Sequence, residues 1–241
     1  MRALITRPSG DAELLAEALR TRGVESAIAP MLAIEPLPDV DLDLSDVQAV
    51  LLTSSNGARA FAAATDDRGV RIFAVGDSTA RVARALKFFR VESASGNVED
   101  LGHLVSKQLN AKDGPILHAA GQVVARDLSG VIINAGFTLR RLVLYRAIPA
   151  TAMPGTATAA LSAGTIDAVL FFSPRTAATF VTLAGDAGLA EYCKSITALC
   201  LSEPVAEAAR AIEWRAVEVA ERPSQSQLLR LIDRLAAGGG V

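Results

Sequence analysis

The polar residues best suited to chemistry in this chain lie where short apolar stretches end and helical patterns begin. Four such turns are present, with the sequences "TSSNG", "VGDST", "FSPRT" and "LSEPV". Hydroxyl groups, together with the free N–H groups of a helix start, suit the binding of carboxylates or phosphates. The residues that these turns place on a predicted anion-binding surface are Ser54, Ser55, Asn56, Gly76, Ser78, Ser173, Arg175 and Ser202. Taken singly, each serine is equally typical of an ordinary helix cap.

The motifs of cofactor-dependent and hydrolytic enzymes are missing from the sequence. It has no glycine-rich nucleotide-binding motif, no HExxH motif and no metal-spaced His/Cys cluster, so no cofactor or metal is expected. "VGDSTA" approaches a nucleophile elbow, with Ser78 between a strand and a helix. A hydrolase would also need an acid to orient a histidine. The nearest acid before His118 is Asp113, at the opposite end of the same predicted strand and about 16 Å away, which disfavours serine hydrolysis.

The elements that must position these turns follow an α/β pattern. Short β-like runs alternate with helical patterns, which is typical of parallel sheets. The strand candidates are "RALIT", "VQAVLL", "RIFAV", "RVESA", "PILHA", "DAVLFF", "ITALCL" and "AVEVA". A helix is expected to start near Asp11, another at the cap pair Ser173–Pro174, and a third at the capping box of Ser224 and Gln227.

The second half of the chain repeats segments of the first half. The matching pairs are Val50–Phe61 with Val169–Phe180, Phe73–Ala85 with Leu199–Ala211, Ser95–Val105 with Arg222–Ile232, and Ala3–Pro36 with Pro115–Pro149. With the last pair named A and A′ and the others B and B′, the chain reads A–B–A′–B′. This order predicts two folded units, each with about four parallel strands.

The two units could be arranged in tandem, or one could be inserted into the other. The extended, proline-terminated runs "SAIAPMLAIEPLP" and "LRRLVLYRAIPA" supply two linker strands for crossing between units, which favours the nested arrangement. Domain 1 is then expected over residues 1–35 plus 150–241, and the inserted domain 2 over 39–145, with linker strands over about 27–38 and 139–149. Strand ends that face each other across such a hinge would form a cleft for a large anion.

Composition restricts the possible partners. The chain has 241 residues, 51% of them hydrophobic, and a net charge of −2, which argues against a nucleic-acid groove or a polybasic membrane anchor. Its apolar runs are shorter than the roughly 20 residues of a membrane span, and "MRALITRPSG" reads as a strand and turn rather than a signal peptide. Cys193 and Cys200 are expected to be reduced core thiols. A cytoplasmic protein is therefore expected, and its even-handed charge and the lack of an obvious apolar patch favour a monomer.

An ordered set of segments carries a family resemblance over nearly the whole chain. These segments are "ITRP", "LTSSNGARAF", "AVGDSTA", "LYRAIP", "VLFFSPRTAATF", "LCLSEPVAEAAR" and "ERPSQSQLL". The chain resembles uroporphyrinogen III synthase, a cyclising lyase of porphyrin and heme biosynthesis. The resemblance implies two nested, flavodoxin-like α/β domains joined by a two-stranded β-ladder. It also implies closure of hydroxymethylbilane to uroporphyrinogen III, with loss of water and inversion of the last pyrrole ring, and no cofactor or metal. Such a reaction depends mainly on positioning a polycarboxylate substrate.

The resemblance also implies roles for particular residues. Tyr145 in "LYRAIP" stands where the family has its candidate catalytic tyrosine, which could donate a hydrogen bond to the departing hydroxyl, although a tyrosine that only packs between the linker strands would fit too. Thr79 matches a threonine that lines the family's cleft, whereas its counterpart Val205 departs from the threonine that relatives often carry, so Ser202 could take its place. The remaining residues expected at the substrate are Arg7, His118, at the expected end of its strand, and Gly121.

Two questions stay open at this point. Arg126, Arg140, Arg141 and Arg146 could meet substrate carboxylates, but arginines are more often solvated surface residues. The main rival to the enzyme is a non-catalytic two-lobed protein that binds an anion or a tetrapyrrole, or a related regulatory module, because two α/β lobes on a hinge also describe receptors that close on a ligand.

Overall fold

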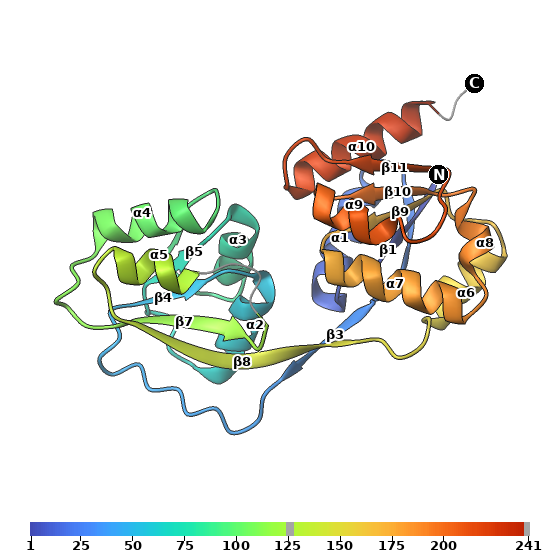
Figure 1. The fold of residues 1–241 in the computed structure, drawn as a ribbon. Helices are drawn as coiled ribbons and strands as arrows, with labels where there is room; N and C mark the ends of the chain where they lie inside the picture. Colours follow the sequence, from blue (N-terminus) through green and yellow to red (C-terminus); the bar gives the residue numbers. More distant parts are fainter. Residues whose placement is uncertain (124–127, 239–241) are drawn as a thin grey trace. The chain divides into compact units, whose positions relative to one another are not determined.

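The computed structural model describes residues 1–123 and 128–238, and it divides the chain into two compact units. Unit 1 consists of Met1–Ala33 and Ile148–Val241, and unit 2 of Ile34–Ala147. Unit 2 is therefore inserted into unit 1, as the nested arrangement requires. Each unit is built around its own sheet with helices on both faces (Figure 1).

The sheet of unit 1 has the strand order β11-β10-β9-β1-β2. Its strands are β1 (Arg2–Ile5), β2 (Glu25–Ile28), β9 (Ala168–Phe171), β10 (Thr197–Cys200) and β11 (Ala216–Val219), and neighbouring strands pair in parallel. The helices are α1 (Ser9–Arg20), α6 (Gly155–Ser162), α7 (Pro174–Asp186), α8 (Ala190–Cys193), α9 (Glu203–Ala209) and α10 (Gln225–Gly238). The central strands β1, β9 and β10 are short and almost wholly buried, as expected for a sheet covered on both faces, whereas the edge strands β2 and β11 are only partly buried.

The sheet of unit 2 has the order β3-β8-β7-β4-β5-β6. Its strands are β3 (Leu32–Pro36), β4 (Ala49–Leu52), β5 (Ile72–Ala74), β6 (Val91–Ser93), β7 (Ile116–Gly121) and β8 (Leu139–Pro149). The helices are α2 (Ser55–Ala64), α3 (Asp77–Ala85), α4 (Val98–Gln108) and α5 (Leu128–Asn134). The chain passes between the units within β3 and within β8, which are neighbours in this sheet. That these strands act as a hinge stays a prediction.

The sequence repeat corresponds to two copies of one topology. In unit 1, β1 lies between β2 and β9, and β10 and β11 follow beyond β9; in unit 2, β7 lies between β8 and β4, and β5 and β6 follow beyond β4. Segments A and B′ thus build unit 1, and segments A′ and B build unit 2 with the same strand order. The order along the chain differs, because unit 2 begins, after β3, with β4, the counterpart of β9, which is the third strand of unit 1. The prediction of two α/β sheets is confirmed, and both sheets are predominantly parallel.

Each sheet has an apolar core on both of its faces. In unit 1, one core contains Phe180 of α7 and the other contains Leu15 of α1. In unit 2, one core contains Phe61 of α2 and the other contains Ile132 of α5. The helices that follow the neighbouring strands β1 and β9, α1 and α7, therefore lie on opposite faces of the sheet, and so do α5 and α2, which follow β7 and β4. The carboxyl ends of such strand pairs are where open α/β sheets bind ligands.

The local expectations hold with small shifts. Ser173 caps α7, whose first residue is Pro174, and the Ser224 hydroxyl accepts a hydrogen bond from the backbone N–H of Gln227. The first helix begins at Ser9 rather than near Asp11, because Pro8 precedes it as the cap. Asp11 instead lies in the first turn, where a negative charge favours the helix.

Candidate functional site

Tyr145 and Ser54 meet at the carboxyl edge of the sheet in unit 2. The phenol oxygen of Tyr145, on β8, lies 3.0 Å from Oγ of Ser54, which directly precedes α2. Tyr145 is buried to 9% exposure and packs in the core beneath α2 and α3. The two side chains therefore form a hydrogen bond in a place with little water to compete for it.

A bulge and a glycine bring Tyr145 into this position. The pairing of β7 with β8 shifts register after Ala120, so that Gly121 pairs with Tyr145 instead of Leu144. Such a shift re-aims side chains on the bulged strand. A Cβ on Gly121 would lie 2.7 Å from Cζ and 2.9 Å from the hydroxyl oxygen of Tyr145, so the ring occupies the space that only glycine leaves open. Gly121, predicted as a substrate contact, here forms the seat of the tyrosine.

Ser54 is held by the first turn of α2. Its hydroxyl accepts a hydrogen bond from the backbone N–H of Gly57 at 3.0 Å, as a helix cap does. A Cβ on Gly57 would lie 3.0 Å from the carbonyl oxygen of Ala119, so this turn lies close against β7. Ser55 is buried beside it, and Asn56 accepts a hydrogen bond from Arg59 at 3.2 Å.

His118 is enclosed within the sheet rather than placed at a strand end. β7 continues three residues beyond it to Gly121, and His118 is only 2% exposed. Its Nε2 lies 3.3 Å from the hydroxyl of Thr53. Burial, and secondarily the charge of Arg141, lowers the pKa of His118 to about 4. By strand alternation His118 shares a face with Ile116, whereas Tyr145 lies in the core of the other face, so the structure does not bring the two together.

The arginines near this edge have protein partners. Arg141 donates from Nη2 to the carbonyl oxygens of Gly121, at 2.7 Å, and of Gln122, at 2.9 Å, and so holds the end of β7. Arg140 forms an ion pair with Asp46, and Arg146 forms one with Glu35. Arg126 lies outside the described residues. Of the three arginines among the described residues, Arg141 is the one placed at the strand end, and it acts there on the backbone.

The turn before α3 differs from the turn before α2. Gly76 precedes the helix, and Ser78 is exposed. Thr79 is 5% exposed, so its side chain faces the interior of unit 2 instead of the surface predicted for it. Asp77 in the first turn accepts a hydrogen bond from Ser95 at 2.7 Å, and bonds from Ser93 and Ser95 lower the pKa of Asp77. A carboxylate at this helix start makes it less favourable for a second anion.

The corresponding edge of unit 1 carries an arginine held in place. The Arg7 guanidinium lies 4.4 Å from the centre of the Phe172 ring, forms an ion pair with Asp11, and donates to Gln225 at 3.2 Å. Arg7 follows β1 and Phe172 follows β9, so this group lies at the carboxyl ends of these two neighbouring strands. The buried Thr6 hydroxyl donates to the carbonyl oxygen of Leu170 at 2.7 Å and ties the same strand ends together.

In unit 1, the starts of α7 and α9 differ from each other as the starts of α2 and α3 do in unit 2: one is a serine cap with no acidic residue in the first turn, and the other has an acidic first turn. Ser173 caps α7 by accepting from the N–H of Thr176 at 3.2 Å, and Arg175 is exposed in the first turn. Ser202 precedes α9 with its side chain half-buried, and Glu203 adds a carboxylate to that first turn. Val205, the counterpart of Thr79, is 1% exposed, so the departure from threonine falls at an interior position. The starts of α2 and α7 have no acidic residue in their first turn, so no carboxylate there opposes an anion.

Sequence reasoning missed three contributors to this arrangement. Thr53, Phe172 and Asp11 contact predicted site residues, yet none was placed in the site. Thr53 and Phe172 are the first residues of the predicted turns "TSSNG" and "FSPRT", and that position was the available signal. The contact of Arg7 with Phe172 joins positions 165 residues apart (172 − 7) and has no local signature.

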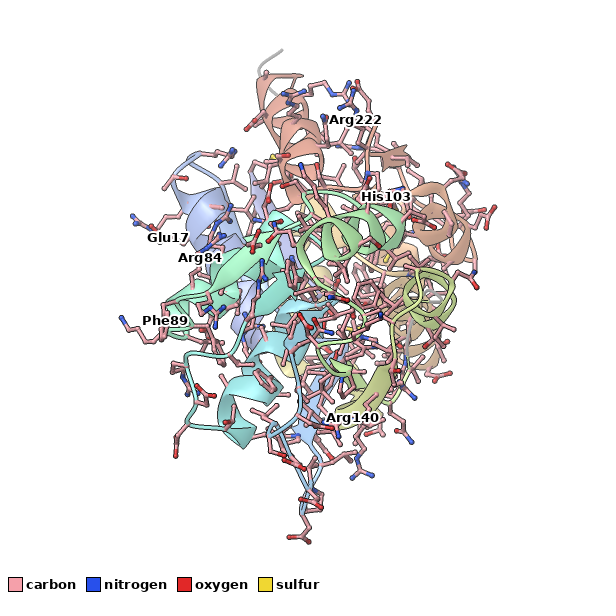
Figure 2. The ribbon with its side chains drawn as sticks, turned by 90° about the vertical axis from the view of Figure 1, so that its left-hand side faces the viewer. Glu17, Arg84, Phe89, His103, Arg140 and Arg222 are labelled. Atoms are coloured by element: carbon pink, nitrogen blue, oxygen red, sulfur yellow. The ribbon has the colours of Figure 1, made fainter. Side chains whose placement is uncertain are left out.

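Other titratable groups lie away from these edges. His103 is exposed on α4 (Figure 2). Within residues 1–123 and 128–238, no three His, Cys, Asp or Glu side chains are grouped so that they could hold a metal ion. A cavity of about 710 Å³ in unit 1 is lined by Asp167, Arg215 and Glu218 among others, at the amino ends of β9 and β11, which is the edge opposite the predicted turns.

Comparisons of the sequence with known proteins identify one family. The model of the family described as uroporphyrinogen-III synthase HemD matches residues 13–230. A porphyrin biosynthesis protein HemD from Ruminiclostridium josui is 25% identical over 252 residues; the match covers 98% of this chain and 48% of that protein, so the chain spans about half the length of this curated relative.

Two solved structures share the fold. The uroporphyrinogen-III synthetase of Helicobacter pylori has a TM-score of 0.65 at 14% identity, with 98% of this chain and 100% of that chain covered. A mutant uroporphyrinogen III synthase of Thermus thermophilus has a TM-score of 0.52 at 19% identity, with 99% of each chain covered. At these identities the likeness concerns the fold alone.

Proposed function

Because this chain belongs to the uroporphyrinogen-III synthase HemD family, we propose that it cyclises hydroxymethylbilane to uroporphyrinogen III, with loss of water and inversion of the last pyrrole ring. The product would serve porphyrin and heme biosynthesis. The observation that carries the proposal, beside family membership, is the hydroxyl pair of Tyr145 and Ser54 at the carboxyl edge of β4 and β7.

Tyr145 is the proposed proton donor for loss of the substrate hydroxyl. As the C–O bond breaks, the bonding electrons leave with the oxygen, which takes the phenol proton and departs as water. The lone pair of the pyrrole nitrogen fills the electron deficit at the methylene carbon. The tyrosinate later recovers a proton when the closed macrocycle loses one from carbon, so the net change is loss of one water.

Ring inversion is proposed to depend on how the substrate is held. The cationic methylene must attack the substituted carbon of the last ring, giving a spiro intermediate, because closure at the unsubstituted position gives the uninverted isomer without an enzyme. Holding the reacting carbons in that geometry is a positioning task and needs no strong acid–base pair.

The substrate carboxylates are proposed to bind at the strand-end turns of each unit. In unit 2 these are Ser54, Ser55 and Asn56, with Gly76, Ser78 and Thr79 at the next turn, although Asp77 and the burial of Thr79 make that turn the weaker contributor. In unit 1 they are Ser173 and Arg175 at the start of α7, with Arg7 and Ser202 nearby in the strand order. Free N–H groups at a helix start and an exposed guanidinium both favour carboxylates.

A coupled assay tests the proposal. Hydroxymethylbilane is generated in place with and without this protein, and the oxidised porphyrin isomers are separated. A dominant type III isomer is the expected product. If only the type I isomer forms, at the rate of the blank, the catalytic proposal fails, and binding of a linear tetrapyrrole without turnover would then support the non-catalytic alternative.

The finer points of organisation are also proposals. No helix among residues 1–123 and 128–238 is long and apolar enough to cross a membrane. We propose a cytoplasmic monomer whose units move about β3 and β8 during turnover. Light scattering coupled to size-exclusion chromatography should give a mass near 25.1 kDa, and a mass of twice that value would contradict the monomer.

A further inference from the structure

Ser54 has two hydrogen-bond partners, and only one of them belongs to helix capping. Its Oγ accepts from the Gly57 N–H at 3.0 Å and lies 3.0 Å from the phenol oxygen of Tyr145. Ser173, the equivalent cap in unit 1, accepts from Thr176 N–H and pairs with the Thr176 hydroxyl within its own helix turn. The two serines thus share one capping role, and Ser54 has an additional contact across 91 residues of sequence.

We propose that Ser54 is a positioning residue that couples the start of α2 to the phenol of Tyr145 and stabilises the tyrosinate formed when Tyr145 gives up its proton. The proposal rests on the proposed function only in taking Tyr145 as the proton donor. A hydroxyl that accepts from a backbone N–H becomes a better donor through its own hydrogen, because hydrogen bonds in a chain polarise one another.

The direction in which Ser54 shifts the ionisation of Tyr145 depends on whether the neutral or the ionised phenol gains more from their hydrogen bond. A bond from Ser54 O–H to the phenol oxygen is stronger when that oxygen carries negative charge, since charge-assisted hydrogen bonds are roughly twice as strong as neutral ones. The positive end of the α2 dipole acts in the same sense. Ser54 therefore favours release of the proton of Tyr145.

The surroundings keep the two hydroxyls at this distance. The ring of Tyr145 rests where Gly121 has no Cβ, and Gly57 allows the first turn of α2 to approach the carbonyl of Ala119. Arg141 fixes the end of β7 through the carbonyls of Gly121 and Gln122. Because both partners are anchored to β7, the loss of the Ser54 hydroxyl cannot be made good by a small movement of the tyrosine.

The test uses the fact that the chain has two tyrosines. In a Tyr192→Phe background Tyr145 is the sole tyrosine, and its ionisation is followed by the ultraviolet absorbance of tyrosinate. Ser54→Ala should raise the titration midpoint by about one pH unit, a tenfold change in the ionisation constant. Ser54→Thr, which keeps the hydroxyl, should restore the parent value. Ser173→Ala, which removes the matched cap alone, should leave the midpoint where it was.

A second measurement is made at neutral pH, so that it does not require the variants to stay folded at the alkaline pH of the titration. Carbon-13 at Cζ of tyrosine reports the hydrogen bond of Tyr145 directly by nuclear magnetic resonance, and this resonance should move in Ser54→Ala but not in Ser173→Ala. In the coupled assay Ser54→Ala should lower kcat about tenfold, as expected for weaker proton donation by Tyr145, whatever KM change follows from the proposed carboxylate contact of Ser54. An unmoved resonance, or a midpoint equal to that of Ser173→Ala, would overturn the inference. Both spectroscopic measurements can be made even if no type III product forms. The proposed role of Ser54 and the proposed cyclase activity can therefore be refuted independently.

Discussion

Gly121 and Tyr145 are paired across β7 and β8 at a bulge, and the Cβ that the glycine lacks would lie 2.7 Å from Cζ of the phenol. Gly121→Ala should therefore push the ring away from Ser54, lower type III synthesis toward that of Tyr145→Phe, and cost about 1–3 kcal/mol of stability. Gly185→Ala in α7 is the matched control, because a Cβ there meets nothing within 4 Å. The control should keep its activity and gain up to about 1 kcal/mol. Full activity in Gly121→Ala would show that the seat of Tyr145 is not needed.

Tyr145→Phe removes the proposed proton donor and keeps the ring. We expect kcat for the type III isomer to fall by about a hundredfold, the lower end of what general acids contribute, with a small change in KM. Tyr192→Phe is the control, since Tyr192 lies in α8 and is 42% exposed. A kcat that falls equally in both variants would count against a chemical role for Tyr145.

The buried His118 should make the protein sensitive to acid. Its pKa is about 4 in the folded chain and near 6.5 when unfolded, so the unfolded state binds the proton first as the pH falls. Stability should be unaffected above pH 6.5 and should decline between pH 6.5 and 4, by about 3 kcal/mol from this residue. Urea unfolding at pH 7 and pH 4 should show this part of the decline disappearing in His118→Gln and persisting in His103→Gln, the exposed control. An unchanged decline in His118→Gln would refute the assignment.

Arg141 should matter more than the neighbouring Arg140. Arg141→Gln removes the bonds to the carbonyls of Gly121 and Gln122 and should cost about 2 kcal/mol. Arg140→Gln breaks an exposed ion pair with Asp46 and should cost less than about 1 kcal/mol. Because the charge of Arg141 also lowers the pKa of His118, its loss should narrow the acid-sensitive range. Equal losses of unfolding free energy in the two variants would contradict the role given to Arg141.

The two cysteines should be inert in the folded chain. Burial raises the pKa of Cys193 and of Cys200 to about 12, so the thiolate fraction at pH 8 is about one part in ten thousand. A thiol reagent should label both residues only after unfolding in denaturant, and the labelling rate can then serve as a measure of opening. Rapid labelling of the native protein at pH 8 would show that one thiol is exposed or activated.

Much of the fold follows from local sequence. Seven of the eight strand candidates contain a whole strand of the structure, and the eighth, "PILHA", contains the start of β7, which runs on to Gly121. The caps Ser54 and Ser173 stand at the helix starts that their turns predict. These features depend on backbone propensities and on hydrogen bonds within a few residues, so they are legible in short stretches. The duplication also made the similarity of the two strand orders predictable, because two copies of one sequence pattern build two similar sheets.

The candidate site was predictable only in outline. Its location at the strand ends follows from the polar turns that come directly after apolar runs. The orientation of individual side chains could not be predicted in this way. Thr79 and its counterpart Val205 both face the interior, and His118 lies three residues inside β7. Whether a residue in a helix's first turn points inward depends on how the helix rests on its sheet, which nearest neighbours do not encode.

By itself, the sequence of this chain determined two largely parallel α/β sheets, the helix caps and the family, and it favoured a nested order of the two units without excluding a tandem one. The tertiary structure alone decided that Tyr145 meets Ser54, that Gly121 provides its seat, and that Arg141 holds the strand end. The physical reason is register. A shift of one residue between β7 and β8 changes which side chains share a face, and a pairing that joins residues 91 positions apart is selected by packing over the whole unit.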